Sequence, residues 1–169
     1  MESDLIRIAA HLAPKLVSVR DDWIRSLESL VTHRSTPTRD SVVSSVVSAY
    51  QIHLLLQIVP FYLEPTQIDR FVEELVGTLT LPESTLFETY LARYTEFPRR
   101  REDRWQPLFR FTFDIALAYN HKKPSSTESR AISRHVPRLV LLIGLAVAEA
   151  FGDDETIAEL RPQLTNRVN

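Results

Sequence analysis

Apolar residues recur at intervals of three or four along most of this chain, which is the spacing of α-helices that bury one side. Residues 4–31 begin the pattern, and Pro14 predicts a break there between a short helix and a longer one. The apolar positions of this stretch are Leu5, Ile8, Leu12, Leu16, Trp23, Leu27 and Leu30. The chain is therefore expected to open with helices.

Prolines and polar clusters divide the middle of the chain. Residues 33–40 predict a polar loop that ends in a helix N-cap, and Pro60 is expected to end the helix that follows. Two residue pairs with the spacing of a capping box predict the starts of the next two helices, which reach Leu79 and Tyr94. These pairs are Thr66 with Asp69 and Thr80 with Glu83.

Two apolar faces are predicted for the helix over residues 105–119. The first face consists of Trp105, Leu108, Phe109, Thr112, Ala116 and Tyr119. The second face consists of Phe111, Ile115 and Ala118. Such a helix is expected to be central and buried on both sides.

The C-terminal part is expected to hold one long helix and one short helix. Residues 121–130 predict a loop, and the long helix then runs to Phe151 with a bend near Pro137. Gly152 is expected to end it before a short helix that starts at Asp153. The whole pattern predicts an all-α fold of about six to seven helices.

Length and composition favour one domain and exclude several kinds of chemistry. Residues 1–169 suffice to bury an apolar core, and a net charge of −2 creates no field that would attract nucleic acid. The absence of cysteine excludes disulfides and thiolate sites and favours a reducing compartment, so we predict a cytoplasmic protein. With three glycines, no Rossmann, P-loop or GxSxG motif can be written. The longest apolar run, residues 139–151, is shorter than a membrane span and contains Glu149, so no membrane contact is predicted.

The densest cluster of charge is EFPRRREDRW, residues 96–105. Its four arginines are interleaved with three acidic residues, so its net charge is only +1. Strong binding to nucleic acid needs several phosphate contacts. We therefore predict a solvated, ion-paired segment with no nucleic-acid partner, and a small-anion or partner site is the alternative.

The five histidines show none of the spacings of helical zinc or di-iron sites, so no metal site is predicted. His53 lies beside Tyr50 on the apolar face of one predicted helix. In that position His53 could ligate haem or hydrogen-bond a small molecule. The alternative is a partly buried structural histidine. Tyr50 and His53 are thus the candidate binding residues, while no resident cofactor is predicted.

The sequence shows no catalytic arrangement. Most of the fourteen serines fall in caps, loops or helix surfaces, and none has a recognisable relation to a histidine and an aspartate. We therefore predict that the chain is not an enzyme and keep a small helical enzyme as a third hypothesis. The acidic residues 153–155 suit a helix N-terminus better than a calcium loop.

Three stretches carry a resemblance to a known family: RDDWIRSL at 20–27, LTLPESTLFETYLARY at 79–94, and VPRLVLLIGLAVAEAF at 136–151. Together they resemble the N-terminal, non-haem globin-like sensor domain of the RsbR-type stressosome co-antagonists and related bacterial regulators. In that family a tryptophan ends a polar segment of the opening helix, as Trp23 does here. A central helix begins Leu-x-Glu and continues to an arginine, as Leu81 to Arg93 does approximately.

The resemblance implies a globin-like fold without haem that dimerises and passes a stress signal to an output domain or partner protein. The chain departs from the family in the insertion-like PRRREDRWQP, residues 98–107, which lengthens the junction after the central helix. No output domain follows Asn169, so the chain is either a truncated piece or acts on an output in another chain. The second hypothesis, a small-molecule or haem carrier that uses His53, stays open.

A homodimer is predicted from the helix over about residues 136–151, which is apolar nearly all round. Gly144 and Ala148 lie four residues apart, and their small side chains would let the same helix of a second subunit approach closely. The alternative is a core helix wrapped entirely by its own domain.

Overall fold

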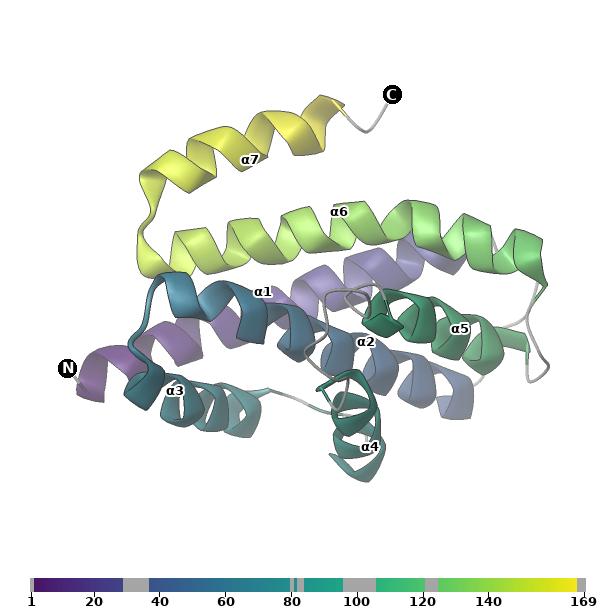
Figure 1. Ribbon diagram of the computed structural model, residues 1–169, viewed down its shortest axis with the longest axis horizontal. Coiled ribbons are helices and arrows are strands. Elements are labelled where there is room, and N and C mark those ends of the chain that lie inside the picture. The colour runs from purple at the N-terminus through teal and green to yellow at the C-terminus, as the bar shows by residue number, and fades with distance from the viewer. Residues whose placement is uncertain are drawn as a thin grey trace. The chain divides into compact units, whose positions relative to one another are not determined.

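The computed structural model describes residues 2–28, 37–79, 81, 84–95, 106–120 and 125–166. Within these residues the regular structure is entirely helical, with seven α-helices and one short 3-10 helix (Figure 1). They are α1 (Glu2–Glu28), α2 (Pro37–Ile58), η1 (Val59–Phe61), α3 (Pro65–Thr78), α4 (Ser84–Thr95), α5 (Gln106–Asn120), α6 (Ser126–Phe151) and α7 (Asp154–Asn166). The predicted all-α fold with about six to seven helices is confirmed.

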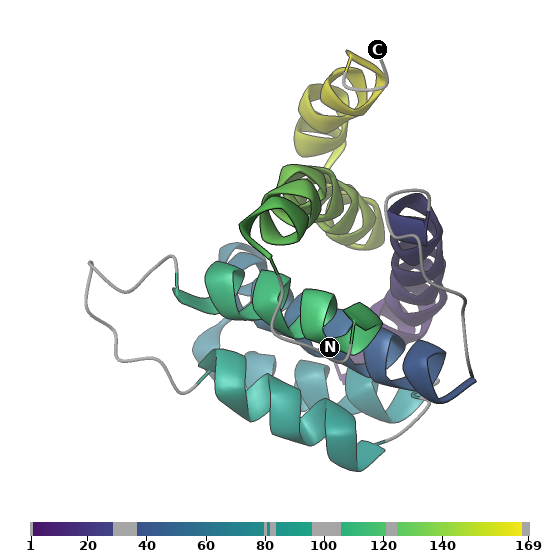
Figure 2. The ribbon, with the colours of Figure 1, turned by 90° about the vertical axis from the view of Figure 1, so that its right-hand side faces the viewer.

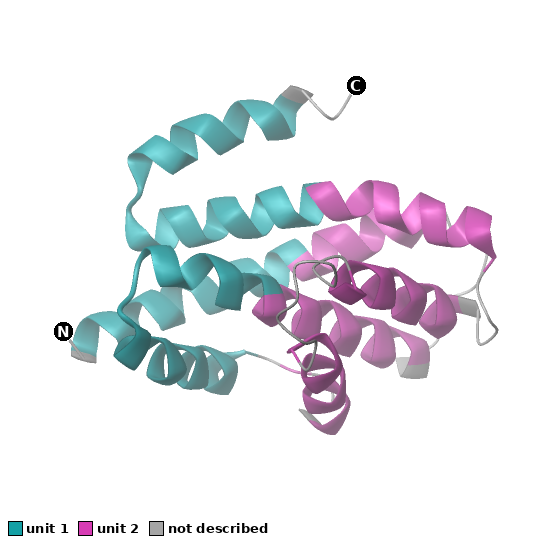
Figure 3. Ribbon diagram, in the orientation of Figure 1, with its two compact units in different colours: residues 1–19, 54–80, 138–169 teal, residues 20–53, 81–137 magenta. Residues whose placement is uncertain are grey.

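The chain is organised as two compact units that interleave along the sequence (Figure 3). Unit 1 comprises Met1–Val19, Leu54–Thr80 and Arg138–Asn169, and unit 2 comprises Arg20–His53 and Leu81–Pro137. Helices α1, α2 and α6 each contribute residues to both units. The single domain over residues 1–169 stays a prediction.

The core of unit 1 is built from aliphatic side chains of α1, α3 and α6 together with the aromatic Phe71 of α3, and α2 and η1 add one buried residue each. Its buried residues are Leu5, Ala9, Leu12, Ala13, Leu16, Leu55, Val59, Phe71, Leu75, Leu139, Ile143, Ala146, Val147 and Ala148. In the same unit α7 lies along the last turns of α6 (Figures 1 and 2). The two helices come close at Gly144, where an added Cβ would meet Cδ1 of Leu160 at 3.3 Å.

Pro14 lies inside α1, so the predicted break between two helices is wrong. The proline removes one backbone hydrogen bond and costs about 3 kcal/mol in a helix interior. Its neighbours Leu12, Ala13 and Leu16 are 2% exposed or less. Burial of a leucine contributes roughly 1.5–3 kcal/mol, so packing on both sides of the proline outweighs the loss.

Several predicted helix starts are also displaced. α2 begins at Pro37, inside the predicted loop, because a proline is well suited to the first helical position. α3 begins at Pro65 for the same reason, and the side chain of Gln67 accepts a hydrogen bond of 3.0 Å from the Glu64 N–H. The predicted box of Thr66 with Asp69 is therefore wrong. The box of Thr80 with Glu83 lies outside the described residues.

The C-terminal junctions are largely as predicted, although α6 begins inside the predicted loop over residues 121–130. Ser125 starts α6: its hydroxyl accepts from the Glu128 N–H at 3.2 Å, and its own N–H donates to the Glu128 carboxylate at 2.8 Å. α6 ends at Phe151, and Gly152 takes a φ of +71°, a left-handed conformation that glycine adopts without strain. The carboxylate of Asp153 then caps α7 by accepting from the Thr156 N–H at 3.0 Å.

The core of unit 2 is richer in aromatic side chains. Its buried apolar residues are Trp23, Leu27, Val43, Val46, Val47, Ala49, Tyr50, Ile52, Phe87, Tyr94, Phe111, Ile115, Ala116, Ala118, Tyr119, Ile132 and Val136. The indole N–H of Trp23 donates to the His135 carbonyl at 3.0 Å, and its ring centroid lies 5.4 Å from that of Phe111. Trp23 therefore ties α1, α5 and α6 together within this unit.

The prediction that α5 is buried on two sides is confirmed for most of the described residues. In the first predicted face Thr112, Ala116 and Tyr119 are buried, and in the second face Phe111, Ile115 and Ala118 are buried. The exception is Phe109 of the first face, which is 64% exposed. Trp105 of the first face lies outside the described residues. A third side of α5 is open to solvent and includes apolar residues.

Two described helices are long and apolar enough to cross a membrane by length and hydropathy alone: residues 39–61 and residues 126–151. The whole of α6 passes this test by the mean hydropathy of 18 of its residues, although its longest apolar run, residues 139–151, is shorter than a membrane span. Core helices of soluble proteins pass the same test, and 67% of the window in residues 39–61 is buried inside the protein. This finding does not by itself assign a membrane to the chain.

Candidate functional site

The predicted binding residues Tyr50 and His53 belong to an aromatic cluster in unit 2. The rings of Tyr50 and Phe111 are stacked with centroids 4.0 Å apart and planes 5° apart. Tyr94 of α4 presents its edge to the Tyr50 ring at 5.7 Å, and His53 lies 5.8 Å from Tyr50 and 6.4 Å from Tyr94. The structure therefore brings Tyr50 and His53 together, as the sequence analysis expected.

The surroundings of these two residues are filled by other rings. Tyr50 is 4% exposed, and one face of its ring is covered by Phe111. Burial raises the pKa of the Tyr50 hydroxyl to about 12 and lowers the pKa of His53, so His53 is neutral at pH 7. A neutral imidazole is the form that ligates haem. The rings of Tyr50 and Tyr94 already lie 5.8 and 6.4 Å from the imidazole of His53, and the haem or small-molecule carrier that uses His53 stays a hypothesis.

The chemically unusual group of unit 2 is Asp114, whose side chain is 1% exposed. The hydroxyl of Tyr94 donates to Oδ2 of Asp114 at 3.0 Å. Nη2 of Arg93 lies 3.1 Å from Oδ1 of Asp114, which is an ion-pair distance. This oxygen is buried and accepts no hydrogen bond from the described residues. Two consecutive residues of α4 thus hold one carboxylate of α5, and we call Arg93, Tyr94 and Asp114 the Asp114 site.

Burial dominates the electrostatics of the Asp114 site. Burial raises the pKa of Asp114, while the charge of Arg93, the hydrogen bond from Tyr94 and the charge of Arg110 act in the opposite direction. Burial and the nearby Asp114 charge raise the pKa of Tyr94 far above its ordinary range. Tyr94 is therefore always protonated, and it serves as a fixed donor to the carboxylate.

Tyr90 completes the outer side of the Asp114 site. The guanidinium carbon of Arg93 lies 5.8 Å from the centroid of the Tyr90 ring, within the range of a cation–π contact. Burial, followed by the charge of Asp114, raises the pKa of Tyr90. The side chain of Arg93 is 41% exposed, so the site connects a buried charge to the surface.

The sequence analysis missed the Asp114 site. Its one signal was a single acidic residue inside the apolar stretch LFRFTFDIALAY of α5. Nothing in that stretch reveals that Arg93 and Tyr94, twenty or so residues earlier, would face it. A lone acidic residue on a helix is usually solvated, and only the packing of α4 on α5 buries this one.

The residues of the predicted dimer interface lie in unit 1. Ala148 has no exposed surface within the single chain, and Gly144 faces Leu160 of α7. Ala148 is thus covered by its own chain, whereas Gly144 is half-buried. Because Val140 of the same helix is 38% exposed, α6 is not wrapped on all sides. The homodimer itself stays a prediction.

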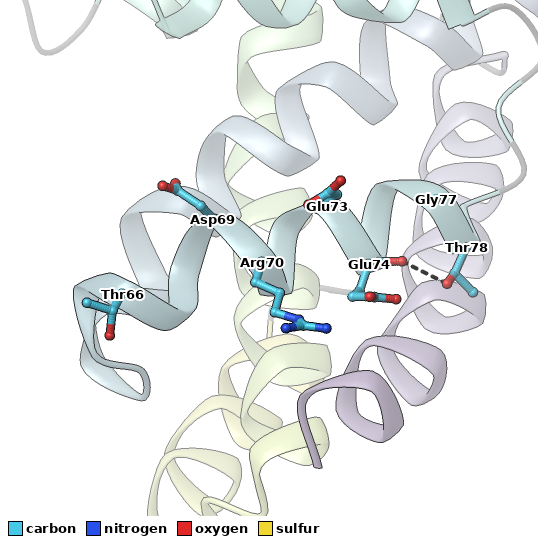
Figure 4. Close-up of a pocket in the computed structure, with 7 residues that line it drawn as sticks. All are labelled: Thr66, Asp69, Arg70, Glu73, Glu74, Gly77 and Thr78. Carbon is cyan, nitrogen blue, oxygen red and sulfur yellow. Dashed lines mark hydrogen bonds between the residues drawn. The ribbon is translucent and has the colours of Figure 1, made fainter. Parts of the chain in front are cut away.

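One hollow in unit 1 runs along α3 and has a volume of about 790 Å³. It is lined by Thr66, Asp69, Arg70, Glu73, Glu74, Gly77 and Thr78, all from this one helix. Figure 4 shows Asp69 and Glu73 projecting to one side while Arg70 and Glu74 project to the other. The carboxylates therefore do not converge, and no metal-binding group of histidine and acidic residues occurs in the described parts of the chain.

A smaller groove of about 220 Å³ lies between α1 and α6 in unit 1. Its two charged residues, Lys15 and Glu149, pair with each other, and Arg161 of α7 also contacts Glu149 at 3.3 Å. The hydrogen bond from Lys15 is the main reason that the pKa of Glu149 is lowered. The two charged side chains of this groove are thus already ion-paired within the chain.

Comparison with known proteins adds no assignment: no family model, curated protein or solved structure matches this chain. The arginine-rich stretch over residues 96–105 lies outside the described residues, as do His33 and His121. The candidate functional site is therefore the Asp114 site with its aromatic neighbours.

Proposed function

We propose that this chain is a non-enzymatic, cytoplasmic sensory domain that passes a signal to an output partner through a movement of α4. A signalling domain needs an element with two arrangements that differ by a few kcal/mol. The observation that carries the proposal is the attachment of α4 to α5 through the buried Asp114 carboxylate. The resemblance to RsbR-type sensor domains agrees with this role.

The structure of α4 suits a movable element. The helix has 12 residues, too few to be stable in isolation, so it depends on its contacts. Of its residues with described side chains, Phe87 and Tyr94 are buried. Because Asp114 is buried with incomplete hydrogen bonding, the charge contact is sensitive to small changes in geometry or protonation.

Hydrogen exchange of the full chain tests the proposal. We expect amides of α4 to exchange through a local opening, and Tyr94→Phe should speed this exchange about tenfold, because it removes the hydroxyl that donates to the buried Asp114 carboxylate. Amides in the middle of α2 serve as the internal reference and should not change. Exchange of α4 only through global unfolding, in both proteins, would refute a movable α4.

An absorbance spectrum separates the sensor from the carrier hypothesis. A sensor without haem should be colourless and unchanged by added haemin, because aromatic rings pack against Tyr50 and His53. A Soret band that disappears in His53→Ala would favour the carrier instead. The proposed homodimer and the stress signal rest on the sequence analysis alone.

A further inference from the structure

Three exposed arginines follow one another along α6 at intervals of four residues: Arg130, Arg134 and Arg138. Residues four positions apart are neighbours on the surface of a helix, so the three guanidinium groups form one row on this single helix, which we call the arginine row. Within the described part of the chain, none of the three side chains makes an ion pair or a hydrogen bond. The arginine row therefore presents three uncompensated positive charges to solvent.

The arginine row differs from other arginines of this protein. Five described arginines are each paired with an aspartate or glutamate: Arg7, Arg20, Arg25, Arg93 and Arg161. Like charges four residues apart destabilise a helix slightly, and the arginine row contains two such neighbouring pairs. The stability of the single chain therefore gives no reason for this arrangement, whereas an anionic partner would neutralise it.

A matching acidic pair lies on α3. Asp69 and Glu73 are exposed, lie four residues apart and project to the same side of the helix (Figure 4). Neither carboxylate is paired with a described residue, and we call these two residues the acidic row. The hollow of about 790 Å³ runs along the same helix, and a Cβ added at Gly77 would meet no atom within 4 Å. The space beside the acidic row is therefore open to a second helix.

The arginine row and the acidic row match in spacing and in charge. Four residues of an α-helix rise about 6 Å, so the charges of both rows repeat at this distance. Two helices that pack side by side can therefore place Asp69 and Glu73 opposite two successive arginines, as interhelical salt bridges do in coiled coils. Exposed ion pairs are individually weak and are screened by salt, so such a contact is expected to be weak and reversible.

We propose that the arginine row is the docking surface for a second copy of this chain, which binds through the acidic row of its α3. A second copy is favoured over an unrelated acidic protein because one contact then neutralises two sets of charges that the single chain leaves unpaired. This inference rests on the part of the proposed function in which the domain forms a homodimer. It uses a different stretch of α6 from Gly144 and Ala148, and it does not depend on a movement of α4.

Sedimentation equilibrium of the full chain tests the contact. We expect self-association with a dissociation constant of about 0.1–1 mM in about 20 mM salt, and about tenfold weaker association in about 0.3 M salt, because salt screens exposed charges. Arg134→Glu and, separately, Glu73→Arg should each weaken self-association about tenfold in the low-salt buffer. Both side chains are exposed, so urea midpoints should stay near that of the wild type. Arg7→Glu on α1 is the control with the same change of net charge, and it should leave self-association nearly unchanged.

An exchange of charges between two variants locates the contact. A mixture of Arg134→Glu with Glu73→Arg restores opposite charges across one contact, so it should associate about tenfold more tightly than either variant alone. The matched control is a mixture of Arg134→Glu with Glu159→Arg. Glu159 of α7 is also exposed and follows another exposed glutamate, Glu155, by four residues. This second mixture should associate as weakly as Arg134→Glu alone.

Three outcomes would overturn a second copy bound through α3. They are a wild type that stays monomeric at about 1 mM in low salt, a concentration at which even weak contacts are occupied, a mixture of Arg134→Glu with Glu73→Arg that associates no more tightly than either variant alone, and equal restoration by Glu159→Arg. A monomeric wild type that binds random duplex DNA through Arg134 would instead assign the arginine row to nucleic-acid phosphates. Hydrogen exchange of α4 is measured in high salt, where the contact is weakened, so failure of the docking surface and failure of the movable α4 are distinguishable.

Discussion

Each unit contains a hydrogen bond from a tyrosine hydroxyl to an aspartate, and the two differ in environment. In unit 1 Tyr62 donates to Asp153 at 2.8 Å, and in unit 2 Tyr94 donates to Asp114 at 3.0 Å. The pKa of Asp153 is lowered, first by the hydroxyl of Thr156, then by the Thr156 N–H and by Tyr62. The pKa of Asp114 is raised by burial.

The comparison shows that burial, and not the residue pair, decides what an aspartate does. A hydrogen bond to a carboxylate favours its ionised form in both units. At the surface, the N-terminus of α7 adds further donors to Asp153, so its ionised form is strongly favoured. Around Asp114 the loss of water outweighs Arg93, Tyr94 and Arg110 together. Asp153 caps α7. Asp114 holds α4 through Tyr94 and Arg93, but its burial disfavours the ionised form that these two residues stabilise.

Ala148→Arg gives the largest expected effect, and it tests whether burial decides how much a charged side chain lowers the stability of the fold. Ala148 has no exposed surface, so the variant would bury an unpaired guanidinium and lose about 3 kcal/mol or more of unfolding free energy in urea. Val140→Arg is the matched control on the same helix, because Val140 is 38% exposed, and it should change stability by about 0.5 kcal/mol or less. A wild-type dimer that Ala148→Arg converts into a stable monomer would instead support the interface at Gly144 and Ala148.

Tyr94→Phe and Tyr62→Phe sharpen the comparison directly. Each removes one hydroxyl and keeps the ring, which in Tyr62 is stacked on Phe151 at 4.7 Å. Tyr94→Phe leaves the buried Asp114 with one donor fewer and should cost about 1–3 kcal/mol. Tyr62→Phe leaves Asp153 with Thr156 and water, so the effect should be about 0.5 kcal/mol or less. If the two variants lost the same unfolding free energy in urea, burial of the aspartate would not determine how much the tyrosine hydroxyl contributes.

The pH dependence of stability gives the smallest but most specific effect. Because the pKa of Asp114 is raised in the folded protein, the folded state binds the proton more tightly than the unfolded state. The contribution of Asp114 to stability is therefore greatest at low pH and declines as the pH rises from about 3.8, the ordinary pKa of an aspartate, through its folded pKa.

Asp114→Asn should remove this decline. The difference in unfolding free energy between wild type and Asp114→Asn, measured from pH 3.5 to pH 8 in urea, should shift against the wild type as pH rises and then level off. Asp153→Asn should give a difference of the opposite sign, because the pKa of Asp153 is lowered and its contribution is lost as pH falls. If the difference in unfolding free energy from the wild type followed pH in the same way for both variants, the environments of Asp114 and Asp153 would not differ.

The sequence by itself determined the features that depend on neighbouring residues. The helical class follows from apolar spacing over many turns, and the end of α6 follows from Gly152, whose φ of +71° suits no other residue as well. The cap at Asp153 needs only the backbone three residues later. These interactions act within one or two helical turns, so they can be read without knowledge of the fold.

The tertiary structure alone decided which helix sides are covered. Apolar spacing indicates that residues share a side, but it does not show whether another helix lies against that side, so Phe109 is exposed although its pattern predicted burial. The continuation of α1 through Pro14 depends on packing around Leu12 and Leu16. The raised pKa of Asp114 likewise requires α4, more than twenty residues away at its start, to fold onto α5 and exclude water. Burial is a property of contacts between distant segments, and these contacts exist only once the chain is folded.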